Sequence, residues 1–376
     1  MTARFEGRTM RAAVMREVGE PLTIEQLEIA EPGPGEVLVK LAASGVCHSD
    51  LHTLKGEWQA AGLPVVLGHE GAGVVEAVGE GVQRVAVGDP VVLSWTAGCG
   101  RCMRCLIGQP NLCENALESV HSFVMYDGTT RLRKDGEEIY SFLAVASFGE
   151  YAVVPENGAI RVADGVSLEL ASVVGCAVST GVGAATNTVS VPAGASTAII
   201  GLGGVGLSVL QGCVAQSASP VIAIDMHEDK LQAASRLGAT HTINAADGDP
   251  VAAVSELTGG AGVDYAFEAI GLKVTIEQTL AMLGTRGTAV LVGMPPEGVM
   301  FEADPLAITN LEQRIVGSNY GSTVPAVDFP RILRLAEADR LDLSALITQR
   351  LPLDRINEAF EAMERGEGIR TVITYG

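Results

Sequence analysis

The sequence AIIGLGGVGLSVLQ, at residues 198–211, joins a short apolar run, a glycine-rich turn and a second apolar run. The first run predicts a strand and the second a helix, and between them Gly201, Gly203 and Gly206 follow the pattern G-x-G-x-x-G. In such a loop Gly201 allows the tight turn, Gly203 lets a pyrophosphate approach the backbone, and Gly206 lets the helix pack closely on the strand. The helix N-terminus offers free N–H groups and a partial positive charge. This stretch therefore predicts a dinucleotide-binding site.

The sequence on the C-terminal side of this loop continues the alternation of strand and helix. Strands are expected at residues 196–200, 221–225, 241–244, 263–268, 287–293 and 314–318. Helices are expected between them at residues 205–215, 228–238, 250–259 and 274–283. Such alternation indicates βαβ units and a parallel sheet, and six strands fit the doubly wound sheet of a Rossmann domain. We expect this α/β domain to cover residues 178–320.

The second expected strand ends in Asp225, 19 residues after Gly206. A carboxylate at this point can accept hydrogen bonds from the adenosine ribose hydroxyls and would repel a 2′-phosphate. The expected cofactor is therefore NAD rather than NADP. A structural glycine turn that binds no nucleotide is the alternative.

The N-terminal part of the chain is expected to be mostly β. Residues 10–46 and 64–95 consist of short apolar or alternating runs separated by glycine- and proline-rich turns. After about residue 325 only two helices and a last strand remain, which is too little for a separate domain. We expect this tail to pack on the N-terminal half, so that residues 1–177 and 321–376 form one β-rich domain.

Four of the seven cysteines fall in the run CGRCMRCLIGQPNLC, with the spacing C-x2-C-x2-C-x7-C. Four thiolates complete a closed tetrahedral zinc shell, so the run predicts a structural zinc site. An iron–sulfur site begins with the same C-x2-C-x2-C spacing, but its fourth cysteine follows after three residues and precedes proline. Unrelated reduced thiols on a surface loop are the third interpretation. The predicted zinc ligands are Cys99, Cys102, Cys105 and Cys113.

Composition restricts the partners of the protein. The 376 residues include 25 Lys and Arg and 45 Asp and Glu, which gives a net charge of −20. Nucleic acids and anionic membrane surfaces both favour the opposite sign. The opening residues show no apolar region typical of a signal peptide, and the uncharged residues 170–224 are interrupted by Gly, Pro and polar residues. We therefore expect a soluble cytoplasmic protein without a nucleic-acid or membrane partner.

A second metal site could involve Cys47, His69 and Cys176. Cys-His-Cys ligation leaves a fourth position on zinc for water or substrate, which is typical of a catalytic site. Taken singly, the cysteines could be small buried hydrophobic residues and the histidine a core residue with satisfied hydrogen bonds. Their spacing in the sequence does not indicate that the three residues bind the same metal ion.

A resemblance to a known family places these three residues in one site. From about Met10 onward the motifs GVCHSD, GHEGAG, the four-cysteine run, GLGGVG and IRTVI resemble, in this order, the zinc-dependent medium-chain alcohol dehydrogenase family. The segments LESVHSFVMYDGTTR and SFGEY resemble its long-form members, such as liver-type alcohol dehydrogenases and glutathione-dependent formaldehyde dehydrogenases. The resemblance implies a GroES-like catalytic domain with a structural-zinc lobe, a Rossmann domain, NAD, and two zinc ions per chain.

By the same resemblance, Cys47, His69 and Cys176 bind the catalytic zinc, and the carboxylates of Asp50 and Glu70 orient and tune that site. The zinc would lower the pKa of a bound alcohol so that an alkoxide forms.

The remaining residues implied by the resemblance take part in proton transfer, substrate binding and cofactor binding. Ser49 contacts the alcohol, His52 ends a proton relay, and Trp95 lines the substrate pocket. The expected cofactor-binding residues are His48, Thr180, Gly201, Gly203, Gly204, Val205, Gly206, Asp225, Lys230, Val292 and Arg370.

The function implied is reversible hydride transfer between a primary alcohol, aliphatic or aromatic, and NAD. One alternative is a formaldehyde dehydrogenase acting on a glutathione or mycothiol adduct. Another is a zinc-free medium-chain reductase or a non-catalytic member. We expect a homodimer, with a tetramer as the alternative.

Overall fold

A computed structural model describes residues 3–376, which divide into two compact units. Unit 1 comprises the described residues up to Cys176 together with Val324–Arg334 and Ile347–Gly376. Unit 2 comprises Ala177–Thr323 and Leu335–Leu346.

The second segment of unit 2 differs from the expectation that residues 321–376 all belong with the N-terminal half. Two side-chain hydrogen bonds attach this segment to unit 2. Gln211 accepts a hydrogen bond from the backbone N–H of Asp342 at 2.6 Å and donates one to its carbonyl oxygen at 3.3 Å. These contacts lie far apart in the sequence, so no local pattern indicated them.

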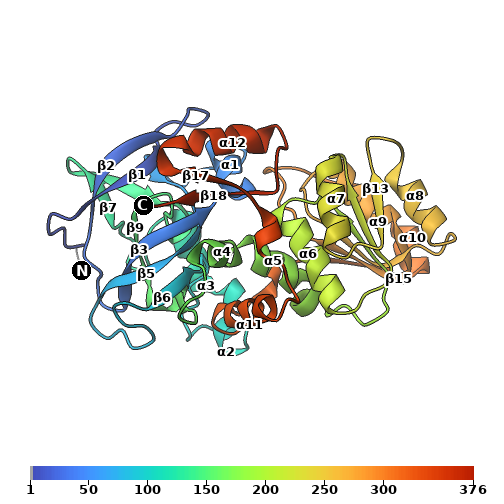
Figure 1. Ribbon diagram of the computed structural model, residues 1–376, viewed down its shortest axis with the longest axis horizontal. Coiled ribbons are helices and arrows are strands. Elements are labelled where there is room, and N and C mark those ends of the chain that lie inside the picture. Colours follow the sequence, from blue (N-terminus) through green and yellow to red (C-terminus); the bar gives the residue numbers. More distant parts are fainter. Residues whose placement is uncertain (1–2) are drawn as a thin grey trace. The chain divides into compact units, whose positions relative to one another are not determined.

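Unit 2 contains a six-stranded parallel sheet (Figure 1). Its strand order is β13-β12-β11-β14-β15-β16, which is the doubly wound order 3-2-1-4-5-6 of a Rossmann fold. The strands are β11 (Thr197–Ile200), β12 (Val221–Asp225), β13 (His241–Asn244), β14 (Val263–Glu268), β15 (Leu283–Leu291) and β16 (Arg314–Gly317). The six expected strands are therefore present, and the predicted fold class is confirmed.

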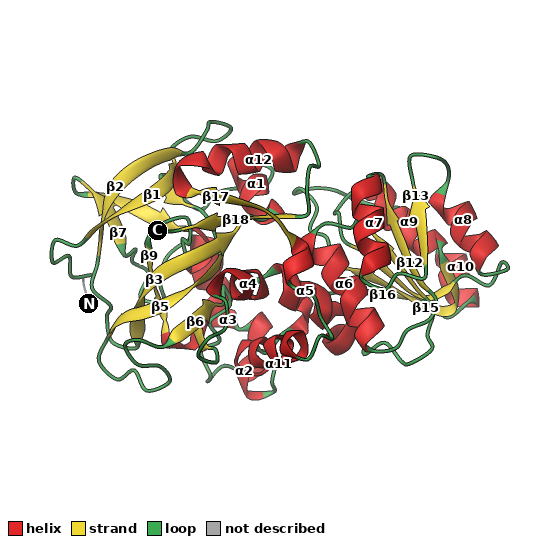
Figure 2. Cartoon of the chain, viewed as in Figure 1, coloured by secondary structure: helices red, strands yellow, loops and turns green. Residues whose placement is uncertain are grey.

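Helices lie on both sides of this sheet (Figure 2). They are α5 (Ala177–Gly183), α6 (Gly204–Ala215), α7 (Glu228–Arg236), α8 (Pro250–Leu257), α9 (Lys273–Ala281) and α10 (Pro305–Asn310). Because both faces of the sheet are covered, Ile199, Ile222 and Ala266 in its middle strands are fully buried. This double burial explains why the strands appear in the sequence as continuous apolar runs.

Unit 1 is β-rich and contains a closed barrel and a second sheet. The barrel order is β1-β2-β7-β8-β4, and the sheet order is β10-β6-β5-β3-β18-β17, with β9 also paired to β3. The barrel strands are β1 (Thr9–Met15), β2 (Thr23–Ile29), β4 (Val65–Val66), β7 (Leu132–Lys134) and β8 (Glu137–Ser141). The sheet strands are β3 (Glu36–Gly45), β5 (Glu70–Val78), β6 (Pro90–Leu93), β9 (Tyr151–Pro155), β10 (Ala159–Arg161), β17 (Ile347–Pro352) and β18 (Arg370–Thr374).

The last strand closes unit 1. β18 pairs antiparallel with β3, with Val372 opposite Gly45, so the C-terminal strand lies beside an N-terminal one (Figure 1). The helices of this unit are α1 (His48–Leu54), α2 (Met103–Leu106), α3 (Glu114–Ser122), α4 (Leu168–Ser172) and α12 (Ile356–Glu364), and α11 (Pro325–Glu337) begins in it. A hydrophobic core cluster of this unit includes Met10, Leu38, Phe148 and Phe360.

No helix of the described residues has the features of a membrane span by itself. Within residues 3–376, no single helix is long and apolar enough to cross a bilayer. The bent pair Leu168–Gly175 and Ala177–Thr188 meets the length and composition criteria only when both helices are taken together.

Candidate active site

Helix α1 begins at Cys47, which is its N-cap residue. The N–H of Cys47 donates to Oδ2 of Asp50 at 3.1 Å, which holds the first turn closed. A cysteine at a helix N-terminus is favoured as thiolate, because the helix dipole places a partial positive charge there. The local sequence thus favours the thiolate form of Cys47, which is the form that binds a metal ion.

Asp50 also positions His69. Its Oδ1 accepts the N–H of Gly68 at 2.9 Å and lies 3.3 Å from Nδ1 of His69. Burial alone would lower the pKa of His69, but the Asp50 carboxylate raises it above its usual range. Within residues 3–376, Nε2 of His69 is buried without a hydrogen-bond partner. A carboxylate on Nδ1 and a buried, unpartnered Nε2 are the arrangement of a metal-binding histidine.

His69 is one of four buried side chains that come close together. One ligand atom each from Cys47, His69, Glu70 and Cys176 lies within 4.8 Å of the others. Sulfur ligands of a tetrahedral zinc ion at about 2.3 Å lie about 3.8 Å apart, so the residues present fit zinc. The hydrogen bond from Cys176 lowers the pKa of the Cys47 thiol, and the same bond together with burial raises the pKa of the Cys176 thiol.

Glu70 pairs with Arg370 in the same buried region. Its Oε1 lies 3.5 Å from Nη1 of Arg370, which also donates to the carbonyl oxygen of Val46 at 2.6 Å. Burial raises the pKa of Glu70 to about 7 despite this cation. Gly45 makes room for the carboxylate, because a Cβ there would lie 2.0 Å from Oε2. The structure therefore places Arg370, which was expected to bind the cofactor, next to a carboxylate of the ligand cluster.

The two residues of the expected proton relay lie on α1. The hydroxyl of Ser49 is 3.8 Å from Sγ of Cys47, so it lies beside the ligand cluster. The ring of His52 contacts two residues that sequence reasoning missed. Glu57 Oε2 is 2.5 Å from Nδ1, and Trp58 stacks on the ring with centroids 4.7 Å apart.

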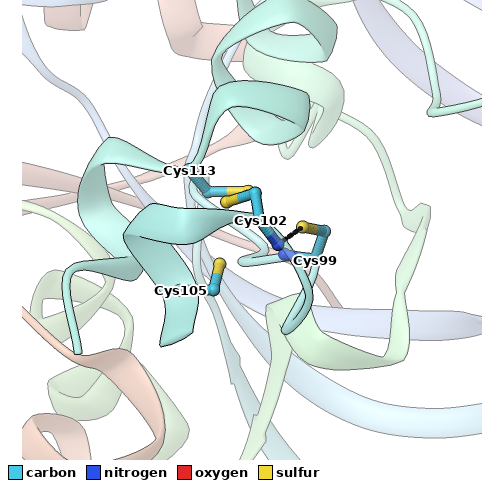
Figure 3. A group of neighbouring side chains, drawn as sticks. All are labelled: Cys99, Cys102, Cys105 and Cys113. Carbon is cyan, nitrogen blue, oxygen red and sulfur yellow. Dashed lines mark hydrogen bonds between the residues drawn. The ribbon is translucent and has the colours of Figure 1, made fainter. Parts of the chain in front are cut away.

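The second metal-ligand set is the four-cysteine lobe (Figure 3). Cys99, Cys102, Cys105 and Cys113 each place Sγ within 4.8 Å of the others, and Sγ of Cys102 is 3.8 Å from Sγ of Cys113. That separation matches the spacing of two sulfur ligands on one tetrahedral zinc ion. All seven cysteines of the chain are free thiols.

Backbone geometry prepares this lobe for thiolates. Cys102 and Cys113 are the N-cap residues of α2 and α3. The N–H of Cys99 donates to Sγ of Cys113 at 3.3 Å, and the N–H of Cys102 donates to Sγ of Cys99 at 3.4 Å. Asn157 ties the lobe to the sheet by donating to the carbonyl oxygen of Gly98 at 2.9 Å. The two N–H···S hydrogen bonds donated by Cys99 and Cys102 favour the thiolate form of the sulfurs that accept them.

The glycine loop of unit 2 has the geometry of a phosphate site. Gly201 has φ +90°, and a Cβ on Gly206 would lie 1.6 Å from the carbonyl oxygen of Gly201. A Cβ on Gly203 would meet nothing within 4 Å, so this face of the loop is open. No side chain caps the N-terminus of α6, which begins after Gly203. The loop fits a dinucleotide pyrophosphate.

Asp225 has a structural role that the sequence did not indicate. Its Oδ2 accepts the N–H of Leu202 at 2.7 Å, and Oδ1 accepts those of Met226 and His227 at 2.8 and 3.0 Å. The carboxylate therefore holds both the glycine loop and the turn after β12.

The other expected cofactor residues occupy different environments. In unit 2, Thr180 and Val292 are buried and Lys230 is half-buried on α7. Gly204 and Val205 form the first turn of α6. His48, in unit 1, is exposed at the start of α1.

Trp95 borders a small cavity in unit 1. The cavity is also lined by Val120, Tyr126, Leu143 and Ala144. The indole is half-buried, so it is both a packing element and part of a concave surface. The expected role of Trp95 in a substrate pocket stays a prediction.

Comparisons with known proteins agree over most of the chain. Residues 33–164 match the alcohol dehydrogenase GroES-like domain, and residues 204–338 match the zinc-binding dehydrogenase family. An alcohol dehydrogenase zinc-binding domain protein from Burkholderia ambifaria is 38% identical, with a TM-score of 0.94 over 98% of this chain and 99% of that one. Benzyl alcohol dehydrogenase from Acinetobacter calcoaceticus is 34% identical, with a TM-score of 0.93 over 98% and 100%. A protein from Sinorhizobium meliloti described as a zinc-binding dehydrogenase, bound to NADP, is 27% identical, with a TM-score of 0.80 over 98% and 100%.

A Rossmann unit with an open glycine loop and a β-rich unit with a buried Cys-His-Cys set define an oxidoreductase. The chain belongs to the zinc-dependent medium-chain alcohol dehydrogenase family. The predicted resemblance and fold are thereby confirmed.

Proposed function

We propose that this protein is an NAD-dependent alcohol dehydrogenase that binds two zinc ions per chain and interconverts primary alcohols and aldehydes. The main support is the buried, unpartnered Nε2 of His69, a residue that groups with the thiols of Cys47 and Cys176. A buried nitrogen without a hydrogen bond is costly unless a ligand occupies it. The four-cysteine lobe supplies the second, structural site.

The chemistry divides between the bound groups and the chain. Zinc held by Cys47, His69 and Cys176 would supply Lewis acidity toward an alcohol oxygen, and a nicotinamide would accept the hydride. The Ser49 hydroxyl, beside Cys47, takes the proton of the alcohol and in the same step passes on its own hydroxyl proton. His52, one helical turn further along α1, delivers that proton toward solvent.

NAD is proposed over NADP because of Asp225. Its carboxylate lies at the end of β12 against the glycine loop, where a 2′-phosphate would meet its negative charge. The relative from Sinorhizobium meliloti was solved with NADP, so a direct comparison of the two cofactors tests this proposal.

Aromatic primary alcohols are proposed as a substrate class. The similarity to benzyl alcohol dehydrogenase supports this class, and so does the flat indole of Trp95 in the cavity wall. Aliphatic primary alcohols are included because the ring face of the indole offers an apolar surface that an alkyl chain can also contact.

Two further observations support a homodimer and a cytoplasmic location as part of the proposal. β16 is the last strand of the unit 2 sheet, and Ile315 on it is 37% exposed, so a second copy pairing at this edge would form a homodimer. A cytoplasmic location fits seven free cysteines, because the cytosol keeps thiols reduced.

One experiment tests the proposed function. The purified protein, with its zinc content measured, is incubated with a panel of alcohols and either NAD or NADP, and cofactor reduction is followed by absorbance. We expect about two zinc ions per chain and reduction of NAD with primary alcohols. A protein without zinc, or one that oxidises no alcohol with either cofactor, would contradict the proposal.

A further inference from the structure

A turn at the end of α1 brings Glu57 and Trp58 onto His52. The helix ends at Leu54, and Gly56 follows with a left-handed φ of +71°. The backbone N–H groups of Glu57 and Trp58 then both donate to the carbonyl oxygen of His52, at 2.9 and 3.3 Å. The chain therefore folds back over the histidine at the point where the helix ends.

The two side chains contact the ring of His52 in different ways. Oε2 of Glu57 lies 2.5 Å from Nδ1, and the Trp58 indole stacks on the ring with an interplanar angle of 25°. The His52 side chain is 12% exposed, whereas that of Glu57 is 38% exposed. One contact at the ring edge and one on its face fix the position and the rotation of the imidazole. Neither Glu57 nor Trp58 has a function that the sequence motifs indicate.

We propose that Glu57 is a positioning residue for proton transfer by His52: its carboxylate accepts the Nδ1–H and leaves Nε2 as the nitrogen that exchanges the proton. A carboxylate on one ring nitrogen sets which tautomer is present. When Nε2 takes up a proton, the ring becomes an imidazolium beside the Glu57 carboxylate. When Nε2 releases that proton to water, the neutral ring with Nδ1–H is restored. The inference rests on the role of His52 in the proposed function.

The other charged groups near this end of α1 do not replace Glu57. Nζ of Lys55 lies 2.7 Å from Oε1 of Glu364 on α12. The His48 ring is tilted by 54° to that of His52, with centroids 6.4 Å apart. Within residues 3–376, His52 forms an ion pair with no carboxylate other than Glu57.

The first test observes the tautomer directly. Glu57→Gln is compared with the control Glu364→Gln, which removes a nearby carboxylate that does not touch His52. Nitrogen NMR on protein with isotope-labelled histidines reports which ring nitrogen carries the proton, and His52→Gln assigns the signal among the six histidines. We expect Nδ1–H in the unaltered protein and the control, and a shift toward Nε2–H in Glu57→Gln. The same tautomer in all three proteins would contradict the proposal.

The second test separates proton transfer from substrate binding. In alcohol oxidation at saturating NAD near neutral pH, Glu57→Gln should lower kcat about 3- to 10-fold and change the KM for alcohol less than about 2-fold. Glu364→Gln should leave both unchanged. In a His52→Gln background, Glu57→Gln should change kcat by less than about 1.5-fold, because both residues act on one step. An equal loss in both backgrounds would mean that Glu57 does not act through His52.

The variants also distinguish failure of this inference from failure of the proposed function. If His52→Gln leaves kcat and its pH dependence unchanged, His52 has no part in the reaction, and the inference fails together with that part of the proposed function. If His52→Gln slows the reaction while Glu57→Gln alters neither kcat nor tautomer, only the role of Glu57 is wrong.

Discussion

Asp50 and His69 form a buried hydrogen-bonded pair, with 3.3 Å between Oδ1 and Nδ1 and side-chain exposures of 0% and 1%. Oδ1 also accepts the N–H of Gly68, and Oδ2 accepts that of Cys47. One carboxylate thus orients the histidine of the ligand cluster and the backbone that presents its first cysteine. Two ligands distant in the sequence depend on the same side chain.

Replacing this carboxylate should therefore weaken metal binding. In Asp50→Asn an amide NH2 would face backbone N–H donors, so the His69 ring would lose its fixed orientation. We expect zinc affinity at the Cys47 cluster and kcat/KM to fall about 10- to 100-fold. Zinc per chain, measured after dialysis against increasing chelator, checks the first effect. Asp249→Asn, at the exposed N-cap of α8, is the control, and equal zinc loss in both variants would contradict the prediction.

The two metal-ligand sets should separate by substitution. Cys47→Ser should abolish turnover, by at least about 100-fold, with little change in Tm, because an open site serves the chemistry. Cys102→Ser should lower Tm and release the zinc of the lobe, because a closed four-cysteine site contributes folding free energy. Activity assays, zinc analysis and calorimetry check both variants. Full activity in Cys47→Ser would show that this cluster is not the catalytic site.

Asp225 should affect both cofactor choice and stability. Asp225→Gly removes the charge and the acceptor of three backbone N–H groups, whereas Asp225→Asn removes the charge and keeps one oxygen. Both should raise the NADP/NAD ratio of kcat/KM about 10-fold or more, and the Gly variant should lose more stability, about 1–3 kcal/mol. Kinetics with each cofactor and denaturant unfolding measure the two effects. Equal kcat/KM values of the unaltered protein with NAD and with NADP would show that Asp225 does not select NAD.

The parallel sheet could be predicted because local sequence determines its strands. Ile222 and Ala266 are fully buried in the covered sheet, so most positions of the middle strands select apolar residues and form short apolar runs. The four-cysteine lobe was also visible, since all its ligands lie within 15 consecutive residues. The assignment of residues 335–346 to unit 2 was missed, because Gln211 and Asp342 meet across 131 positions.

The candidate site could be predicted from local sequence only in part, because its contacts also involve residues that are distant in the sequence. Residue spacing alone did not join Cys47, His69 and Cys176, which were grouped only through the family resemblance. The pair of Glu57 and His52 is close in sequence, but it depends on the left-handed turn at Gly56 and on side-chain rotamers. A glycine after a helix indicates where the helix ends and does not indicate which side chain the returning residues will touch.

Trp95 should influence the range of substrates. If the cavity that it lines admits the substrate, Trp95→Ala should widen it, and Trp95→Phe should keep an aromatic wall. We expect kcat/KM for branched or secondary alcohols, relative to primary ones, to rise about 10-fold in the Ala variant and less in the Phe variant. Initial rates over a panel of alcohols check this. Identical profiles for all three proteins would show that Trp95 does not border the substrate.

The barrel of unit 1 contains a carboxylate whose charge should stabilise the fold. Glu25 accepts hydrogen bonds from Arg16 and Lys134, each at 2.7 Å, and its side chain is 9% exposed. The hydrogen bond from Arg16, followed by that from Lys134, lowers the pKa of Glu25 to about 2, despite partial burial. Glu137, which also pairs with Arg16, is 53% exposed and provides a matched control.

The lowered pKa determines the pH range of the effect. The unfolded chain binds a proton at Glu25 near pH 4.5, whereas the folded protein does so only near pH 2, so the stabilisation is complete above about pH 5 and disappears as the pH falls toward 2. Because both cations are partly exposed, we expect Glu25→Gln to cost about 1–2 kcal/mol at pH 7, against less than about 0.5 kcal/mol for Glu137→Gln. Calorimetry at pH 7 and again near pH 3.5 should show the Tm difference between the unaltered protein and Glu25→Gln becoming smaller in acid. A difference that is independent of pH, or equal in the two variants, would mean that the Glu25 charge does not stabilise the barrel.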